Sequence, residues 1–239
     1  MSVLSIESHK LWADRTDGGH RDATEEAFAS YASELLEVLP TGGVLLDVGC
    51  GNCQVTSYLA PHYTKVCGVD FSESMLLAGR LRLDGLGIQN VELIHGELKD
   101  YPGPERVDAV LLYAVIQYLT VEDFKKNLEA AKRFLKDDGV ICVGLVPDVA
   151  RKDVYYYGFF LQSRFRKLKR LRSWMALTGY RLQGWLKRDP VWDGVGAWFS
   201  HADIRRAAAA VGFDAEFQDA RFSDYRFHAF LRLRESSGA

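Results

Sequence analysis

The stretch that decides the fold runs from residue 44 to residue 53 and reads Val-Leu-Leu-Asp-Val-Gly-Cys-Gly-Asn-Cys. Its first five residues are mostly aliphatic, with an aspartate near the end, which is typical of a buried parallel strand. Gly49 and Gly51 follow at once, and we expect a helix to begin near Cys53. A strand that passes through a glycine turn into a helix brings backbone N–H groups close to a ligand. Asp47, an acid just before the glycines, disfavours a phosphate there and suits a cation or a hydroxyl donor.

The bulk composition is that of an ordinary globular protein. The 239 residues are 48% hydrophobic and 26% charged, enough for one full-sized domain with an appendage. A formal charge of −2 offers no global attraction to nucleic acid or to an anionic membrane. The first ten residues lack the basic start and apolar run of a signal peptide, so we expect a cytoplasmic protein.

Strands and helices alternate outward from the opening stretch. We expect parallel strands at 44–48, 65–70, 91–95, 107–112 and 139–146, and two closing strands near 215–220 and 225–232. Ser72 is expected to cap the helix after the second strand, and Ser200 with Asp203 predicts a capping box for a helix that ends at Gly212. Another capping box at 120–123 predicts a helix that the segment 136–139 closes, with Gly139 as its stop.

Four regions follow from this pattern. An N-terminal cap and helix occupy residues 1–41, and a ligand-binding core occupies 42–146. Residues 147–196 are rich in aromatic and basic side chains and predict an inserted helical lid. Residues 197–239 hold the closing helix and the last two strands. In parallel sheets covered on both faces, ligands bind beyond the carboxyl ends of the strands.

The acids around the glycine loop indicate the ligand. A dinucleotide fingerprint fails because Gln54 stands where it needs glycine, and no P-loop ending is present. Asp70 ends the second strand about twenty residues after the loop, where an acid can accept hydrogen bonds from both ribose hydroxyls. With Asp47 also present, we expect a nucleoside that carries positive charge, a description that S-adenosylmethionine fits.

Cys50 and Cys53 have the spacing of redox and zinc motifs. No second pair accompanies them, and both stand where a glycine loop needs small residues. We therefore interpret them as small apolar residues, with redox or metal binding as the alternative.

Four motifs in order resemble the class I S-adenosylmethionine-dependent methyltransferases. They are Leu-Leu-Asp-Val-Gly-Cys-Gly, Gly-Val-Asp-Phe-Ser-x-x-Met-Leu, His-Gly-Glu-Leu and Val-Asp-Ala-Val-Leu-Leu-Tyr, and they cover roughly residues 44–146. The chain is most similar to the small-molecule branch typified by the ubiquinone and menaquinone C-methyltransferases. The resemblance implies an α/β fold: a Rossmann-like, doubly wound seven-stranded sheet with its last strand antiparallel, here with the inserted lid.

The resemblance also implies roles for individual residues. Asp47, Gly49, Cys50 and Gly51 would line the methionine half and the ribose, and Asp70 would bind the ribose. Around the adenine and beside the sulfonium we expect Phe71, Met75, Gly96, Glu97, Leu98, Leu112, Tyr113 and Gln117. The product of the reaction would be S-adenosylhomocysteine. Two positions depart from the family: Cys53 replaces a third glycine, and Gln117 with Tyr118 replaces a common His-His pair.

The acceptor is less well defined by the sequence. We expect transfer of a methyl group to a small molecule, at oxygen rather than nitrogen or carbon, and a hydroxyl nucleophile needs a base. His20, in the N-terminal cap, and His201, after the capping Ser200, are the candidate catalytic residues. The structural alternative for His201 is a surface residue at a helix N-terminus.

A basic segment leaves further alternatives open. It begins at Arg164, ends at Arg172 and is basic at six of nine positions. It could be the solvated face of a lid helix, or it could contact an anionic membrane surface or a phosphate-bearing substrate. A third interpretation is an RNA or tRNA methyltransferase, which the net charge disfavours. A non-catalytic module that only binds S-adenosylmethionine is the remaining alternative.

Overall fold

A computed structural model describes residues 24–101, 103, 106–157 and 195–234 of the chain. Several predictions from the sequence concern other residues. His20, the basic segment 164–172 and most of the expected lid lie outside the described residues, so they stay predictions.

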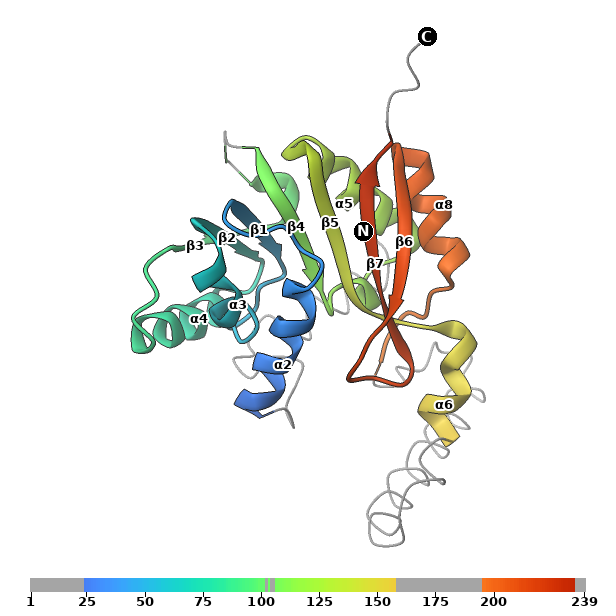
Figure 1. Ribbon diagram of the computed structural model, residues 1–239, viewed down its shortest axis with the longest axis horizontal. Coiled ribbons are helices and arrows are strands. Elements are labelled where there is room, and N and C mark those ends of the chain that lie inside the picture. Colours follow the sequence, from blue (N-terminus) through green and yellow to red (C-terminus); the bar gives the residue numbers. More distant parts are fainter. Residues whose placement is uncertain (1–23, 102, 104–105, 158–194, 235–239) are drawn as a thin grey trace, which may run out of the picture.

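Seven strands form one sheet, in the order β3-β2-β1-β4-β5-β7-β6 (Figure 1). The strands are β1 (Val44–Val48), β2 (Lys65–Asp70), β3 (Val91–His95), β4 (Val107–Tyr113), β5 (Leu135–Pro147), β6 (Phe213–Asp219) and β7 (Arg226–Leu233). The first five strands are parallel, and β7 runs antiparallel to both β5 and β6. The predicted Rossmann-like sheet with an antiparallel last strand is therefore confirmed.

Helices cover both faces of the sheet (Figure 1). The α-helices are α2 (Glu25–Leu36), α3 (Thr56–Leu59), α4 (Glu73–Gly85), α5 (Val121–Lys132), α6 (Lys152–Tyr157) and α8 (His201–Val211), and the 3-10 helices are η1 (Ala60–His62), η2 (Leu98–Asp100), η3 (Ile116–Tyr118) and η4 (Val149–Arg151). Among the described residues, none of these helices has the length and apolar content needed to cross a membrane.

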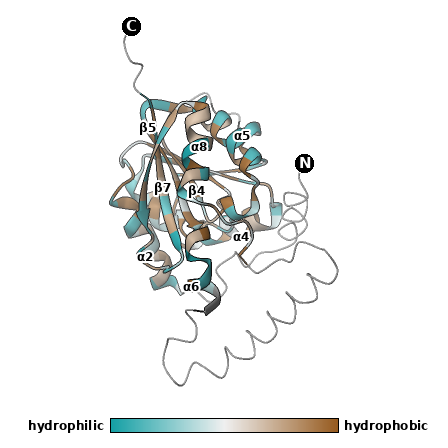
Figure 2. Cartoon of the chain, turned by 90° about the vertical axis from the view of Figure 1, so that its right-hand side faces the viewer, coloured by the Kyte–Doolittle hydropathy of each residue, from teal (hydrophilic) through white to brown (hydrophobic). Residues whose placement is uncertain are grey.

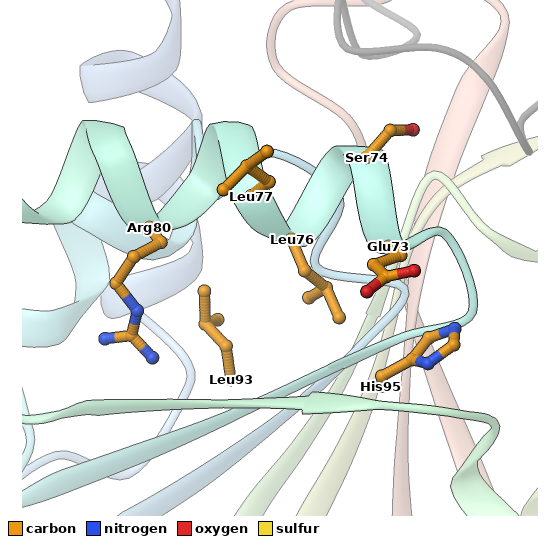
Figure 3. Close-up of a pocket in the computed structure, with 7 residues that line it drawn as sticks. All are labelled: Glu73, Ser74, Leu76, Leu77, Arg80, Leu93 and His95. Carbon is orange, nitrogen blue, oxygen red and sulfur yellow. The ribbon is translucent and has the colours of Figure 1, made fainter.

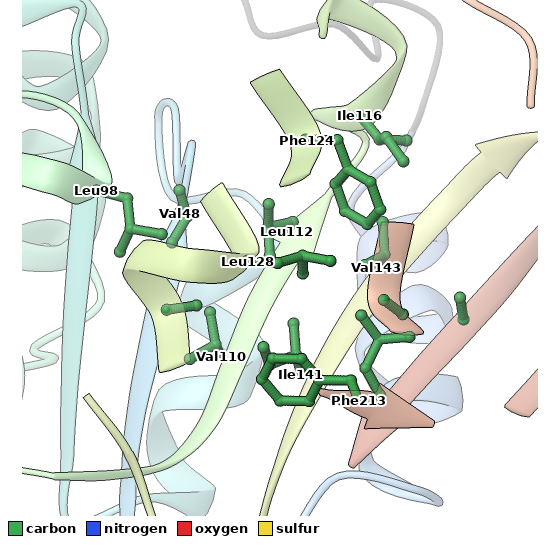
Figure 4. Close-up of a cluster of buried hydrophobic side chains, with 14 of the residues drawn as sticks. Val48, Leu98, Val110, Leu112, Ile116, Phe124, Leu128, Ile141, Val143 and Phe213 are labelled. Atoms are coloured by element: carbon green, nitrogen blue, oxygen red, sulfur yellow. The ribbon is translucent and has the colours of Figure 1, made fainter. Parts of the chain in front are cut away.

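Side chains of successive strand residues point alternately into two hydrophobic cores. On β4, Val110 and Leu112 pack into the core beneath α5 and α8, with Phe124, Leu128 and Phe213 around them (Figure 4). Leu111, between them in sequence, packs into the other core, which includes residues of α2, α3 and α4. Figure 2 shows hydrophobic colouring concentrated on the strands between the helices. Burial on both faces explains why these strands are apolar runs rather than alternating ones.

The predicted helix caps are confirmed. The Ser72 hydroxyl accepts from the backbone N–H of Met75 at 3.3 Å. Ser200 and Asp203 form a complete capping box at the start of α8, and Gly212 ends that helix with φ +93°. A left-handed residue after a helix is favourable for glycine, which has no Cβ to clash.

Two predicted boundaries are wrong. The helix after the glycine loop begins at Thr56 rather than near Cys53, because Cys53 adopts φ +59° and cannot be part of a right-handed helix. The helix α5 ends at Lys132, before the expected stop at Gly139. Leu135 already pairs with Val107 of β4, so the chain enters the sheet at once and the register shifts before Val140.

Candidate functional site

The glycine loop joins the carboxyl end of β1 to α3. Gly49 and Gly51 have φ +74° and +54°, a region that residues with a side chain rarely adopt. The backbone N–H groups of Gly49 and Cys50 donate to the carbonyl of Val69 at 2.7 and 3.2 Å, which fixes the loop against β2. A Cβ built on Gly51 would meet no other atom within 4 Å, so the backbone of the loop is uncovered at this position.

Asp70 is held rigidly at the carboxyl end of β2. Its Oδ2 accepts from the backbone N–H of Gly51 at 2.8 Å, and its Oδ1 accepts from that of Ser72 at 2.8 Å. Its own carbonyl accepts from the N–H of Gly96 at 2.9 Å, which brings the loop after β3 to the same place. Burial raises the pKa of Asp70, and the hydrogen bonds from Ser72 and Gly51 oppose that effect.

Asp47 is a buried acid at the end of β1, with 3% of its surface exposed. The Thr56 hydroxyl donates to its Oδ2 at 2.7 Å. Burial raises the pKa of Asp47 to about 6, the Thr56 hydrogen bond lowers it, and the nearby Asp70 charge raises it further. Two buried acids that resist ionisation would be stabilised as carboxylates by a cationic ligand. This pair of acids fits a sulfonium nucleoside better than a phosphate.

The two loop cysteines pack against glycines of neighbouring elements. A Cβ on Gly79 of α4 would lie 2.8 Å from Cys53 Sγ, and one on Gly68 of β2 would lie 2.9 Å from Cys50 Sγ. The missing third glycine of the motif is thus compensated by Gly79, which leaves room for the Cys53 side chain. A hydrogen bond with Cys53 and burial raise the pKa of Cys50, as expected for a packing residue rather than a reactive thiolate. All four cysteines are free and buried.

The predicted adenine-side residues lie in two environments. Met75 is buried at the first turn of α4, and Glu97 forms an ion pair with Lys99 at 3.0 Å, beside Gly96. Phe71 is half-buried between Asp70 and the cap of α4. Leu98 and Leu112, by contrast, are core residues whose side chains pack beneath the sheet rather than onto an open surface.

A cavity of about 590 Å³ lies between α4 and the edge strand β3 (Figure 3). Glu73, Ser74, Leu76, Leu77, Arg80, Leu93 and His95 line it. None of the predicted cofactor residues is in this lining. The cavity is therefore a neighbour of the glycine-loop site and not the site itself.

Tyr113 is the last residue of β4, and Gln117 lies just beyond it in η3. A Cβ on Gly49 would lie 2.5 Å from Val115 Cγ2, so this segment contacts the glycine loop directly. Tyr113 is buried, and burial raises its pKa, so its phenol is neutral. The buried Gln117 side chain accepts from Arg226 Nη1 of β7 at 2.7 Å. Gln117, which stands in place of one histidine of the common His-His pair, therefore binds Arg226. The sequence analysis did not predict this contact.

Sequence reasoning also missed a buried acid–histidine pair. His228 Nε2 of β7 lies 3.4 Å from Glu34 Oε1 of α2, and both residues are at least 97% buried. The N–H of Leu145 donates to His228 Nδ1 at 3.4 Å, which assigns the ring proton to Nε2. Burial lowers the pKa of His228, although Glu34 opposes that effect. The ring stacks on Tyr113 at 6.4 Å, which ties the pair to the end of β4.

The candidate base His201 lies elsewhere. Its ring stacks on Phe217 of the edge strand β6, with centroids 4.3 Å apart, and meets Phe227 edge-on at 4.3 Å. In the sheet order, β6 is four strands away from β1. The structure therefore does not bring His201 together with Asp47 and Asp70, and its contacts are those of a packing residue.

Known proteins share this core. Residues 45–139 match the family model described as a methyltransferase domain. Demethylmenaquinone methyltransferases of Bacillus mycoides and Bacillus cereus are 32% identical over 148 residues, which cover 59% of this chain and 54% of each relative. The chain thus spans about half the length of the curated relatives it matches.

Solved structures match nearly the whole chain. The structure of DhpI in complex with SAH has a TM-score of 0.65 at 18% identity and covers 98% of each chain. Magnesium protoporphyrin IX methyltransferase (ChlM) of Synechocystis PCC 6803 with bound SAH has a TM-score of 0.64 at 17% identity, covering 96% of this chain and 99% of its own. At these identities the likeness establishes the fold.

The sheet order and the matched segment together indicate the class of protein that this chain resembles. Residues 45–139 resemble a methyltransferase domain, and the sheet has the fold of the class I S-adenosylmethionine-dependent methyltransferases. Within that class it resembles the quinone C-methyltransferases.

Proposed function

We propose that this chain binds S-adenosylmethionine at the glycine loop and transfers its methyl group to a small molecule. The observation that carries the proposal is the pair of buried acids, Asp47 and Asp70, at the ends of adjacent strands around a bare-backbone loop. The relatives named demethylmenaquinone methyltransferases, and the fold neighbours solved with SAH, support both the cofactor and a small acceptor.

Each residue of the loop has a physical task in this proposal. Asp70, oriented by two backbone N–H donors, would accept hydrogen bonds from the ribose hydroxyls. Asp47 would supply negative charge near the positively charged methionine half. Phe71 and Met75 would pack on the adenine, and Glu97 would accept from its amino group. Gly49 and Gly51 allow the backbone to approach the ligand closely.

Catalysis would come mainly from alignment. The bound cofactor would supply a methyl group activated on a sulfonium, and transfer to a hydroxyl oxygen releases S-adenosylhomocysteine and a proton. Holding the acceptor oxygen in line with that methyl group can contribute about 7 kcal/mol or more to the rate. We propose oxygen as the acceptor atom, as expected from the sequence. His20 remains the proposed base, outside the described residues.

The role of the predicted lid remains a proposal. The segment 164–172 is expected to cover the acceptor or to contact an anionic membrane surface or a phosphate-bearing substrate. It lies outside the described residues, as does most of the segment 147–196. No contact among the described residues favours an RNA substrate or a non-catalytic role.

The test uses S-adenosylmethionine labelled in its methyl group and fractionated cell metabolites. We expect label to move to a low-molecular-mass fraction with the wild type and not with Asp70→Ala. Label recovered in RNA would instead support the RNA alternative. Tight binding of S-adenosylhomocysteine without any labelled product would contradict an enzymatic role.

A further inference from the structure

Arg226 is the first residue of β7 and pairs with Pro147 at the end of β5. Its Nη1 donates to the Gln117 side-chain oxygen at 2.7 Å and to the carbonyl of Leu145 at 2.9 Å. Both acceptors are uncharged. The guanidinium is therefore positioned by neutral oxygens beyond the carboxyl ends of β4 and β5.

Among the described residues, no carboxylate pairs with this positive charge. Arg226 is half-buried, yet within the described part of the chain it makes no ion pair with a carboxylate. Other half-buried arginines are paired: Arg82 with Glu25, and Arg151 with Asp219 at 2.6 Å. A partly desolvated cation without an anion is costly unless a ligand supplies the negative charge.

The unused donors of Arg226 have a defined geometry. Because Nη1 holds the two protein oxygens, Nε and Nη2 make no hydrogen bond to any described residue. These two nitrogens form the side-on edge of a guanidinium, which matches the two oxygens of a carboxylate. The free edge can therefore receive a planar carboxylate through two parallel hydrogen bonds.

Aromatic rings lie next to this cation. The guanidinium carbon is 5.2 Å from the centroid of the Tyr225 ring. Tyr225 contacts Tyr155 of α6 at 4.9 Å and Trp198 at 6.0 Å, and the latter two rings are 5.6 Å apart. We call Tyr155, Trp198 and Tyr225 the aromatic cluster. It offers stacking surface for a flat ligand beside the charge.

The arginine also lies near the segment that contacts the glycine loop. Gln117, which it contacts, lies two residues after Val115, and Val115 packs against Gly49 of the glycine loop. Burial raises the pKa of Tyr113 at the end of β4, and the charge of Arg226 opposes that effect. The charge of the arginine thus acts at the end of β4, next to the glycine loop where the cofactor is proposed to bind.

We propose that Arg226 binds the carboxylate of an aromatic acid, which is the acceptor substrate, while the aromatic cluster stacks on its ring. This inference rests on the proposed function, since it names the acceptor class of the same site. Arg226 is a binding and specificity residue here, and it takes no part in the bond changes.

The test is calorimetric titration of protein saturated with S-adenosylhomocysteine. The probes are 4-hydroxybenzoate and its neutral isostere 4-hydroxybenzamide. They differ in the negative charge of the carboxylate that Arg226 would bind. We expect the wild type to bind the benzoate about tenfold or more tightly than the amide, a difference of about 1.4 kcal/mol. Arg226→Gln should lose that preference.

The matched control is Arg206→Gln, an exposed arginine of α8 paired with Asp203, which should keep the preference. Equal affinities in the wild type, no binding of either probe at about 10 mM, or an unchanged preference in Arg226→Gln would overturn the inference. If Arg226→Gln does not fold, the wild-type comparison decides alone. Failure of S-adenosylhomocysteine to bind would instead refute the proposed function.

Discussion

The backbone N–H of Gly51 lies 2.8 Å from Oδ2 of Asp70, and this hydrogen bond joins the glycine loop of β1 to the end of β2. Nineteen positions separate the two residues in sequence. The contact orients the carboxylate before any ligand arrives, so little conformational entropy is lost on binding. The two sequence motifs therefore act as one preorganised site.

The orientation of Asp70 leads to the first prediction. Asp70→Asn keeps the size of the side chain but removes the charge and one acceptor. We expect S-adenosylhomocysteine affinity to fall about 10- to 100-fold, as for loss of hydrogen bonds to a charged group. Calorimetric titration measures this, with the exposed Asp214→Asn as the control that should bind like the wild type. Wild-type affinity in Asp70→Asn would refute the ribose assignment.

Asp47 should make the stability of the unliganded protein depend on pH. Because burial raises its pKa to about 6, the folded protein holds this proton more tightly than the unfolded chain does. The stability contribution is therefore largest at low pH and is lost as pH rises from about 4 to about 6. Asp47→Asn should remove that slope and raise the unfolding free energy at pH 8 by an amount of the order of 3 kcal/mol.

The same variant should discriminate between the two forms of the cofactor. We expect Asp47→Asn to weaken S-adenosylmethionine more than S-adenosylhomocysteine, since only the former is a sulfonium. Urea unfolding between pH 4 and pH 8, and titration with both ligands, provide the measurements. An unchanged pH slope together with an unchanged affinity ratio would show that Asp47 does not interact with the positive charge.

Gly79 is predicted to be indispensable for accommodating Cys53. Gly79→Ala places a Cβ 2.8 Å from Cys53 Sγ, so we expect a loss of about 1–3 kcal/mol in unfolding free energy. Gly85→Ala, on the same helix but with open space around its Cβ, should be neutral or slightly stabilising. Cys53→Ala should recover part of the loss in the Gly79→Ala background. Equal stability of Gly79→Ala and Gly85→Ala would contradict this packing.

Glu34 should matter for stability more than Glu37, the exposed C-cap residue of the same helix. Its Oε1 accepts from the backbone N–H of Arg221 at 2.7 Å and lies near His228 Nε2. Glu34→Ala removes the acceptor of the Arg221 N–H and the buried carboxylate beside His228, so we expect a loss of about 1–3 kcal/mol in unfolding free energy. Glu37→Ala removes only an exposed ion pair with Arg221, which solvent screens, so it should cost much less than Glu34→Ala. Thermal unfolding of both variants tests this, and similar losses would contradict the role of Glu34.

Local sequence patterns were sufficient to predict most of the strands and helix caps. The bounds of β1, β2 and β3 agree with the predicted ones. Strands β1 and β2 are buried over most of their length, so they read as apolar runs, whereas the edge strand β3 has exposed Glu92 and His95. Capping signals are equally local, and Ser72 and Ser200 act as expected. The start of α3 was not predictable, because nothing in the residue type of Cys53 announces a left-handed backbone.

The site was predictable only in part, for the same physical reason. Asp47 and Asp70 stand beside motif glycines, whereas Glu34 and His228 are 194 positions apart and meet only through the packing of α2 on β7. The contact between Gln117 and Arg226 also spans 109 positions. Pairs of this kind leave no periodicity or spacing in the chain, so only the folded structure reveals them.

The glycine loop with its two buried acids is the proposed binding site of S-adenosylmethionine. Titration of the purified protein with S-adenosylhomocysteine, the product form, tests it most directly. We expect saturable one-to-one binding with a dissociation constant below about 100 µM. Absence of saturable heat at about 1 mM ligand would contradict it.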